Sequence, residues 1–198
     1  MRDLPQRTPH IPQFKSKVEI HKALRDSGMP FTLIMANDFF QNDLLYRESI
    51  QEKGIYPHPI GDLGLNRVDV RDIADAAVAI LTQGGHEFHC YPLMGVEVLT
   101  EQDVADIYSH SLGREIRYGG NDLNLWEKKV TGTLPGWLVH NLKLLYESFQ
   151  RHGLRASNED FDLQEKVLGQ LPRSFHTFVE ETVTEWERDG AREHAKVG

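Results

Sequence analysis

The sequence predicts an α/β fold with a parallel sheet, and three patterns along its 198 residues support this. Residues 31–36 are apolar on both alternating faces apart from Thr32, as expected of a strand that helices cover on both sides. A helical pattern at residues 14–27 precedes this run. A second helical pattern at residues 68–81 is followed by another strand pattern at residues 88–93. We expect the chain to be organised around the first helix and strand.

The first helix carries one apolar stripe and has a clear end. Ile20, Ala23 and Leu24 recur at i, i+3 and i+4, so they share a face. Gly28 is expected to end the helix because a left-handed residue costs glycine little, and Pro30 cannot extend it. The short turn then leads directly into the first strand.

A polar and aromatic segment follows that strand. It contains Asn37, Asp38, Phe39, Phe40, Gln41 and Asn42. Open parallel sheets bind their ligands just outside the carboxyl ends of their strands. This segment is therefore the first place where we expect a site.

The later elements follow from caps, glycines and periodicity. Asp69 and Thr100 are suited to cap the helices that follow them, and Gly113 is suited to end the second of these. In order, we expect a short helix at 44–53, an irregular loop at 56–64, a helix at 68–81, a strand at 88–93, a helix at 100–112, a short strand at 114–118, helices at 134–152, 160–168 and 174–186, and a charged tail at 187–198.

Composition limits the class of protein. The formal charge of -8 argues against direct binding of nucleic acid or of an anionic membrane, since both need a basic surface. Cys90 is the single cysteine, so no internal disulfide can form and a reducing, cytoplasmic location is expected. No apolar run approaches the roughly 20 residues that cross a bilayer.

The chain offers no convincing metal site or catalytic nucleophile. His86 and His89 lie three positions apart in a predicted strand, where their side chains would point to opposite faces. This spacing differs from the helical H-E-x-x-H zinc motif. We therefore assign no metal ligand and no catalytic residue.

Several segments together resemble one known family. These are Lys17 with Glu19, DSGMPFTLIMAND, FFQND, VDVRDIADAAVAIL, GHEFHCYPLMG, LTEQDVADIYSHSLGREIRY, LPGWLVHNLKLLYESFQRHG and LGQLPRSFHTFVEE. They resemble the NmrA-like branch of the atypical short-chain dehydrogenase/reductases, which have an NAD(P)-binding Rossmann fold. The resemblance covers the chain from about His10 to Trp186, as the carboxyl-terminal part of such a protein.

The resemblance implies a division of the chain. Residues 14–118 correspond to the remaining Rossmann part, residues 119–186 to a mostly helical subdomain on the substrate side, and residues 187–198 to a tail. The sequence contains no G-x-G-x-x-G or G-x-x-G-x-x-G motif. We therefore expect the N-terminal βαβ units with their Gly-rich loop to be absent. Such a chain would be a fragment or an N-terminally truncated product, or it would need self-association or a complementary polypeptide.

The resemblance also implies a cofactor, NADP(H), and the residues that bind it. These are Lys17, Asn37, Phe39, Phe40, Gln41 and Asn42. A solvated lysine and a buried aromatic anchor are the alternatives for Lys17 and for the two phenylalanines. The tyrosine that such enzymes place four residues before the lysine is replaced by Gln13.

By resemblance, the function is that of an NADPH-dependent quinone or azo-type reductase with a flat, quinone-like acceptor. Two alternatives stay open: a non-catalytic, NADP-binding redox sensor or regulator, and a truncated chain without independent activity. The loop at 56–64 is either a connector or a loop near the substrate pocket. Trp126 and Trp137 belong to helices that either pack in the core or form a pocket wall.

Overall fold

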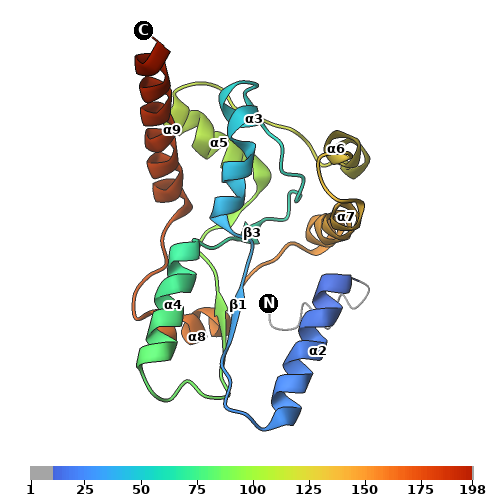
Figure 1. Ribbon diagram of the computed structural model, residues 1–198, viewed down its shortest axis with the longest axis vertical. Helices are drawn as coiled ribbons and strands as arrows, with labels where there is room; N and C mark the ends of the chain where they lie inside the picture. Colours follow the sequence, from blue (N-terminus) through green and yellow to red (C-terminus); the bar gives the residue numbers. More distant parts are fainter. Residues whose placement is uncertain (1–10, 198) are drawn as a thin grey trace.

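The computed structural model describes residues 11–197. It is an α/β structure in which helices surround three short two-stranded sheets (Figure 1). In chain order its elements are α2 (Pro12–Ser27), β1 (Leu33–Ala36), the 3-10 helix η1 (Phe40–Tyr46), α3 (Arg47–Gln51), β2 (Ile55–Tyr56), β3 (Leu65–Asn66), α4 (Val70–Thr82), β4 (Cys90–Leu93), β5 (Val98–Leu99), α5 (Glu101–Leu112), β6 (Arg117–Tyr118), α6 (Leu123–Val130), α7 (Gly136–His152), α8 (Asn158–Leu168) and α9 (Phe175–Val197).

The predicted parallel pair is present. β1 and β4 run parallel, with Leu33 opposite Cys90 and Ala36 opposite Leu93. The chain crosses between them through α4, which packs with α8 against the pair. A small apolar core lies between these elements and is made by Val68, Ala76, Tyr91, Leu93 and Val167.

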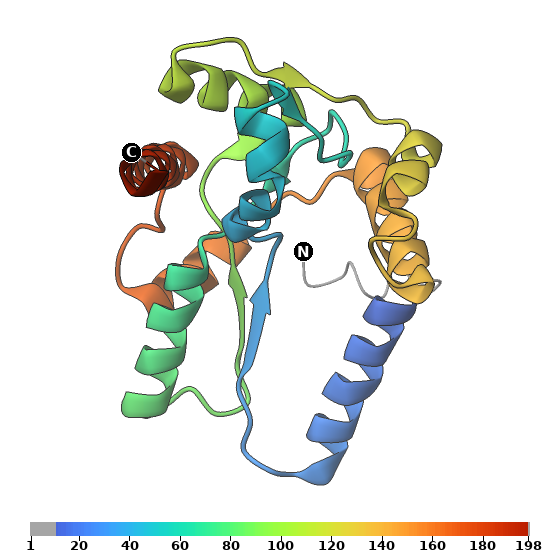
Figure 2. The same cartoon turned by 45° about the horizontal axis from the view of Figure 1, so that its top comes forward.

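β1 has a hydrogen-bonded neighbour on one edge only within residues 11–197. The amides of Leu33 and Asn37 donate to the carbonyls of His89 and Leu93, over 2.9 and 3.1 Å. α2 lies beside β1 (Figures 1 and 2), and its His21 approaches the Phe31 ring before β1 at 6.0 Å between ring centres and the Cys90 thiol of β4 at 3.9 Å. Its predicted end at Gly28 is confirmed, with φ of 68°. The predicted apolar stripe is not buried: Ile20 is 59% exposed.

The two other sheets are much shorter. β2 pairs in parallel with β6, and β3 pairs antiparallel with β5. β2 overlaps the start of the stretch expected to be an irregular loop, and β3 directly follows its end. Strands of two residues carry no readable alternation, which explains why the sequence predicted a loop there.

The largest core lies between η1, α5 and α9. Its aromatic members include Phe40, Tyr56, Tyr108, Phe175 and Trp186. The Trp186 indole stacks on the Tyr108 ring at a centroid distance of 6.0 Å and an interplanar angle of 8°. A second core joins α6 and α7 and includes Trp126, Tyr146 and Phe149.

α9 continues beyond the expected end at residue 186 and is helical to Val197, through the segment expected to be a charged tail. Part of the reason is a contact with α3. The Arg47 guanidinium lies 2.9 Å from the Asp189 carboxylate and also donates to the Trp186 carbonyl over 3.2 Å. These contacts hold the helix against the body of the protein for one further turn.

None of the helices within residues 11–197 combines the length and the apolar character that crossing a bilayer requires.

Candidate functional site

The segment that follows β1 forms a compact turn at the carboxyl end of the β1 and β4 pair. Phe39 makes an isolated parallel bridge with Val68, and the chain then enters η1 at Phe40. Asp38 accepts a hydrogen bond from the Val68 amide over 2.8 Å, and the Phe40 amide donates to the Val68 carbonyl over 2.8 Å. These hydrogen bonds attach the segment to the backbone of Val68, which lies between β3 and α4.

Arg67 is the centre of the segment's support. Its side chain is fully buried, and its Nε lies 2.8 Å from Asp38 Oδ2 while its Nη2 lies 2.8 Å from Asp43 Oδ1. The same Nη2 donates to the Phe39 carbonyl over 2.8 Å. The guanidinium carbon also lies 5.2 Å from the centre of the Phe175 ring. One side chain therefore fixes both ends of the turn.

Arg67 is buried, and its acidic partners stabilise its positive charge. Burial would lower the pKa of Arg67, but the attraction of Asp43 and of other nearby groups raises it well above its usual range. Burial raises the pKa of Asp38 despite the opposing attraction of Arg67. Arg67 is therefore a permanent cation, and Asp43 is its closest completely buried partner.

The two predicted aromatic residues have different surroundings. Phe40 is 1% exposed, and its ring packs edge-on against Phe175 at 5.0 Å between ring centres. Phe39 is 39% exposed at the surface. The structure thus gives Phe40 the position of an anchor, and it leaves the ring of Phe39 accessible to a ligand.

The amides of the segment are already engaged. Gln41 accepts from the Val70 amide over 3.0 Å and donates to Asp69 over 2.9 Å. Asn42 donates to Asp38 over 2.9 Å. Asn37 is buried and donates to the Asn66 carbonyl, while its Oδ1 has no hydrogen-bond partner among the described residues.

Lys17 is exposed on α2, and its Nζ lies 5.9 Å from the centre of the Phe14 ring. Its place in the first half of α2 puts it toward the carboxyl end of β1, since the helix runs opposite to the strand (Figures 1 and 2). The assignment of the six residues to cofactor binding stays a prediction. Within it, Lys17 and Phe39 are the most accessible.

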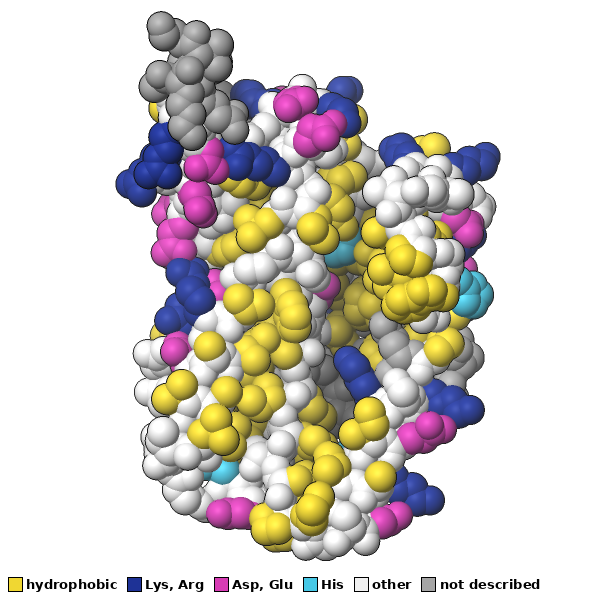
Figure 3. All heavy atoms as spheres, in the orientation of Figure 1, with side chains coloured by type: hydrophobic (Ala, Val, Ile, Leu, Met, Phe, Trp, Pro, Cys, Tyr) yellow, Lys and Arg dark blue, Asp and Glu magenta, His cyan; other side chains and the backbone are white. Residues whose placement is uncertain are grey.

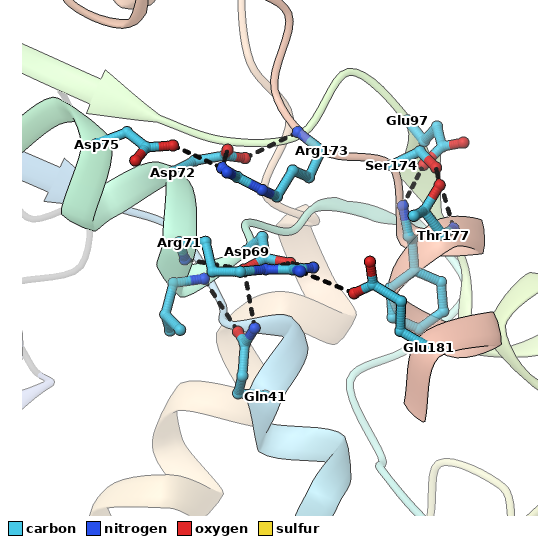
Figure 4. A network of polar contacts seen from close by, with 12 residues as sticks. Gln41, Asp69, Arg71, Asp72, Asp75, Glu97, Arg173, Ser174, Thr177 and Glu181 are labelled. Atoms are coloured by element: carbon cyan, nitrogen blue, oxygen red, sulfur yellow. Dashed lines mark hydrogen bonds and ion pairs between the residues drawn. The ribbon is translucent and has the colours of Figure 1, made fainter. Parts of the chain in front are cut away.

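A polar network joins the segment to α4 and α9. Asp69 caps α4 as predicted, by accepting from the Arg71 amide over 2.8 Å, and it also accepts from Gln41. Arg71 reaches from Asp69 to Glu181 on α9, with distances of 2.7 and 2.8 Å. Figure 4 shows these side chains converging at the start of α4.

Tyr56, His58 and Glu101 form a second buried cluster next to Arg67. Tyr56 donates to Asp43 over 2.9 Å and lies 3.4 Å from His58 Nδ1. His58 Nδ1 is 3.9 Å from Glu101 Oε1. Burial lowers the pKa of His58 to about 3, and burial raises the pKa of Glu101 well above its usual range. At neutral pH His58 is therefore an uncharged imidazole, and burial disfavours the charged form of the Glu101 carboxyl group beside it.

Sequence reasoning did not identify Arg67, Asp43, Tyr56, His58 or Glu101. The one available signal was an arginine within the short, otherwise strand-like stretch before Asp69. Most of these residues lie far apart along the chain, so only the fold brings their side chains into contact.

The histidines near β4 lie outside the strand that was predicted to hold them. β4 begins at Cys90, so His86 and His89 belong to the preceding turn. His86 Nδ1 lies 2.9 Å from the Tyr91 hydroxyl, and His89 Nδ1 lies 2.8 Å from the Glu87 carbonyl. Over residues 11–197, no group of three or more histidine, cysteine, aspartate or glutamate side chains is placed to hold a metal ion.

The curated relatives that match the chain include an azoreductase and a quinone oxidoreductase. The chain is 33% identical over 162 residues to the NAD(P)H azoreductase of Xenophilus azovorans, covering 81% of this chain and 56% of the relative. It is 28% identical over 101 residues to quinone oxidoreductase 2 of Escherichia coli, covering 51% of this chain and 35% of the relative. The chain therefore spans little more than half the length of the azoreductase.

A solved structure shares the fold. The NADPH-dependent quinone oxidoreductase QOR2 of Escherichia coli, solved in complex with NADPH, superimposes with a TM-score of 0.78 at 22% identity. The match covers 87% of this chain and 60% of that one. The model of the NmrA-like family matches residues 2–180. The chain belongs to the NmrA-like family.

Proposed function

We propose that this chain provides the nicotinamide and acceptor side of an NADPH-dependent reductase that acts on a flat quinone or azo compound. Relatives with these activities in their names support the proposal. The NADPH complex of the related quinone oxidoreductase supports the choice of cofactor. The single cysteine suits a cytoplasmic setting.

The observation that carries the proposal is the exposed ring of Phe39 on a rigid support. Arg67 holds the Phe39 carbonyl, and Phe40 anchors the next residue in the core. An aromatic ring presented in this way at the carboxyl end of parallel strands offers a flat face to a planar ligand.

The roles of the remaining residues follow from their chemistry. NADPH, when bound, supplies the hydride. Lys17 would place its ammonium group near the ribose and nicotinamide, and Phe39 would stack on the flat ligand. Asn42 can offer an amide to a ligand only if it gives up part of its bond to Asp38. Gln13 has no phenol, so the proton that the acceptor needs would come from water.

The phosphate side of the cofactor needs groups that we do not assign to this chain. We propose that a complementary polypeptide or a second copy supplies them. The edge of β1 that carries no strand within residues 11–197 supports this, because an open strand edge can pair with another strand.

A non-catalytic NADP-binding sensor is the second candidate, and Gln13 at the position of the usual tyrosine favours it. The two are separated by measuring both binding and turnover. Calorimetric titration with NADPH reports binding, and loss of NADPH absorbance in the presence of a simple quinone reports turnover.

A reductase should show both, whereas a sensor should bind without turnover. A chain that shows neither has no independent activity. In the reductase, Phe39→Ala should lower kcat/KM by about tenfold or more, equivalent to about 1.4 kcal/mol or more. Phe88→Ala is the matched control, because Phe88 is also exposed but lies before β4. Equal losses in both variants would contradict the role of Phe39.

A further inference from the structure

A pocket of about 220 Å³ lies between the η1 and α3 region, the loop after β2, and α6. Six residues define its chemistry: Tyr46, Pro57, Pro59, Leu125, Trp126 and Lys129. Figure 3 shows hydrophobic side chains on both sides of the hollow that separates α6 and α7 from the rest of this face. The pocket is therefore a feature of the contact between α6 and the main body.

The walls of the pocket are flat and mostly apolar. Trp126 is 9% exposed, and its ring is held edge-on against Tyr146 at 5.0 Å between ring centres. The Tyr46 ring lies 5.5 Å from the ring of buried His58. Both aromatic walls rest on buried partners, so their rings are held in place and offer flat apolar faces that suit a planar ligand.

Lys129 supplies the pocket with a cation. It is exposed and makes no ion pair with the other residues of the described range, 11–197. The nearest acidic neighbour on α6, Glu127, is already taken by Lys143 at 2.6 Å. The ammonium group of Lys129 is therefore available to a ligand.

The acidic residue of the pocket is engaged elsewhere. Asp122 caps α6 by accepting from the amides of Asn124 and Leu125 over 2.9 and 3.0 Å. These backbone hydrogen bonds lower the pKa of Asp122, so it stays charged and directed to the helix start. The Asp122 carboxylate is therefore occupied by the backbone of α6, whereas the ammonium group of Lys129 can pair with an anionic ligand.

We propose that this pocket binds a planar aromatic anion of one or two rings. The ring system would lie between the Tyr46 side and the Trp126 side, with its carboxylate or sulfonate toward Lys129. The size is suitable, because a cavity of about 150 Å³ can hold benzene. The identification of this ligand as the electron acceptor rests on the proposed function, but its binding does not.

The test is calorimetric titration of the purified chain, without NADPH, with naphthalene-2-sulfonate. The uncharged naphthalene-2-sulfonamide has the same ring system and serves as the matched ligand. We expect the sulfonate to bind more tightly. Lys129→Gln should weaken binding of the sulfonate about fivefold, the size of an exposed ion pair of about 1 kcal/mol, and should leave the sulfonamide unchanged.

Lys128→Gln is the matched control variant, because Lys128 is the adjacent exposed lysine of α6 and does not line the pocket. It should leave both affinities unchanged. Leu125→Ala should weaken both ligands, since it removes an apolar part of the wall. The melting temperature of each variant verifies that it is folded.

Three results would overturn the proposal: no saturable binding of the sulfonate, equal affinity for the two ligands, or equal effects of Lys128→Gln and Lys129→Gln. Because NADPH is absent, these results are independent of turnover. If the chain binds the sulfonate but does not oxidise NADPH, the pocket proposal stands and the reductase proposal is wrong.

Discussion

Arg67 combines a permanent charge with complete burial, so its free energy depends on its partners. Asp38 and Asp43 supply opposite charges, and the Phe39 carbonyl supplies a further acceptor. Removing one member of such a buried set leaves the others without compensation, which costs more than the intact pair contributes.

We expect Arg67→Met to lower the free energy of unfolding by about 3–5 kcal/mol, because it leaves the carboxylate of Asp43 buried without its cation. Urea denaturation followed by circular dichroism measures this. Arg151→Met is the control: Arg151 is 70% exposed, and its contact with Glu147 is 3.9 Å long. That change should stay within about 0.5 kcal/mol. A similar small effect at Arg67 would show that the cluster is hydrated or dispensable.

The pKa shifts of His58 and Glu101 affect the pH dependence of the free energy of unfolding in opposite directions. The pKa of His58 falls from its ordinary 6.5 to about 3, and that of Glu101 rises well above its ordinary 4.5. As the pH falls from 6.5 to 4.5, the unfolded chain takes up a proton on His58 and the folded chain does not, which lowers stability. The raised pKa of Glu101 acts in the opposite direction, because the folded chain binds the glutamate proton more tightly than the unfolded chain does. The two residues therefore have opposing effects on the pH dependence of stability.

Replacing either residue should reveal the slope of the other. In Glu101→Gln, only the unfolded state takes up the proton, so stability should fall relative to the native chain as pH falls from 6.5 to 4.5. In His58→Phe, the folded state binds the Glu101 proton more tightly than the unfolded state does, so relative stability should rise as the pH falls toward 4.5. Each slope is at most about 1.4 kcal/mol per pH unit. Urea titrations at several pH values measure both, and slopes of the same sign would refute the assignment.

For individual residues, the sequence predicted where the candidate segment lies, but not which of its side chains are buried and which are exposed. Phe39 and Phe40 are adjacent and chemically identical, and only the position of Phe175 makes one an anchor and leaves the other exposed. Asp69 was predictable as a cap because capping is local. The partners of Arg67 were not, because they come from separate elements.

Among the elements, α4 and the approach to α9 are joined by Arg173. Its guanidinium contacts Asp72, which is 1% exposed, and lies 2.8 Å from the more exposed Asp75 (Figure 4). The Arg173 amide also donates to Asp72 over 2.9 Å. One arginine thus connects the first turn of α4 with the segment that leads into α9.

We expect Arg173→Gln to cost about 1–3 kcal/mol of stability, because Asp72 stays buried and retains only the backbone hydrogen bond. Asp75→Asn removes the exposed partner of the same arginine and should cost less than about 1 kcal/mol. The comparison uses chemical denaturation of both variants. Equal costs would mean that burial of Asp72 does not decide the energy of this contact.

The elements themselves were largely predictable where they were long. The caps at Asp69 and Thr100 and the glycine ends at Gly28 and Gly113 are local signals, and the structure confirms them. Short strands and the length of α9 depend on distant contacts, such as that of Arg47 with Asp189. Such contacts leave no periodic pattern in the sequence.

For the whole molecule, the edge of β1 that has no paired strand within residues 11–197 is the feature with the widest effect. In a parallel pair, successive amides along a strand point to opposite edges. Since Leu33 and Asn37 donate toward β4, the amides of Ile34 and Ala36 point away from it. Hydrogen exchange should therefore be faster at Ile34 and Ala36 than at Leu33 and Asn37.

Exchange followed by nuclear magnetic resonance makes this measurement. Equal protection at all four amides would show that a further strand covers the edge. Protection that appears only at high protein concentration would indicate a second copy, and protection that appears on adding another polypeptide would identify the partner that the proposed function requires.

The placement of the three tryptophans gives the molecule a built-in set of optical reporters. Trp137 is 69% exposed, Trp126 is 9% exposed at the pocket wall, and Trp186 is 4% exposed beneath Arg47. Iodide in solution should quench the emission of Trp137 first, and the remaining emission should come from the two shielded indoles. A ligand in the pocket would then change the signal of Trp126 while Trp186 continues to report whether α9 is docked. The emission spectrum of this chain can therefore distinguish occupancy of one pocket from loss of the fold.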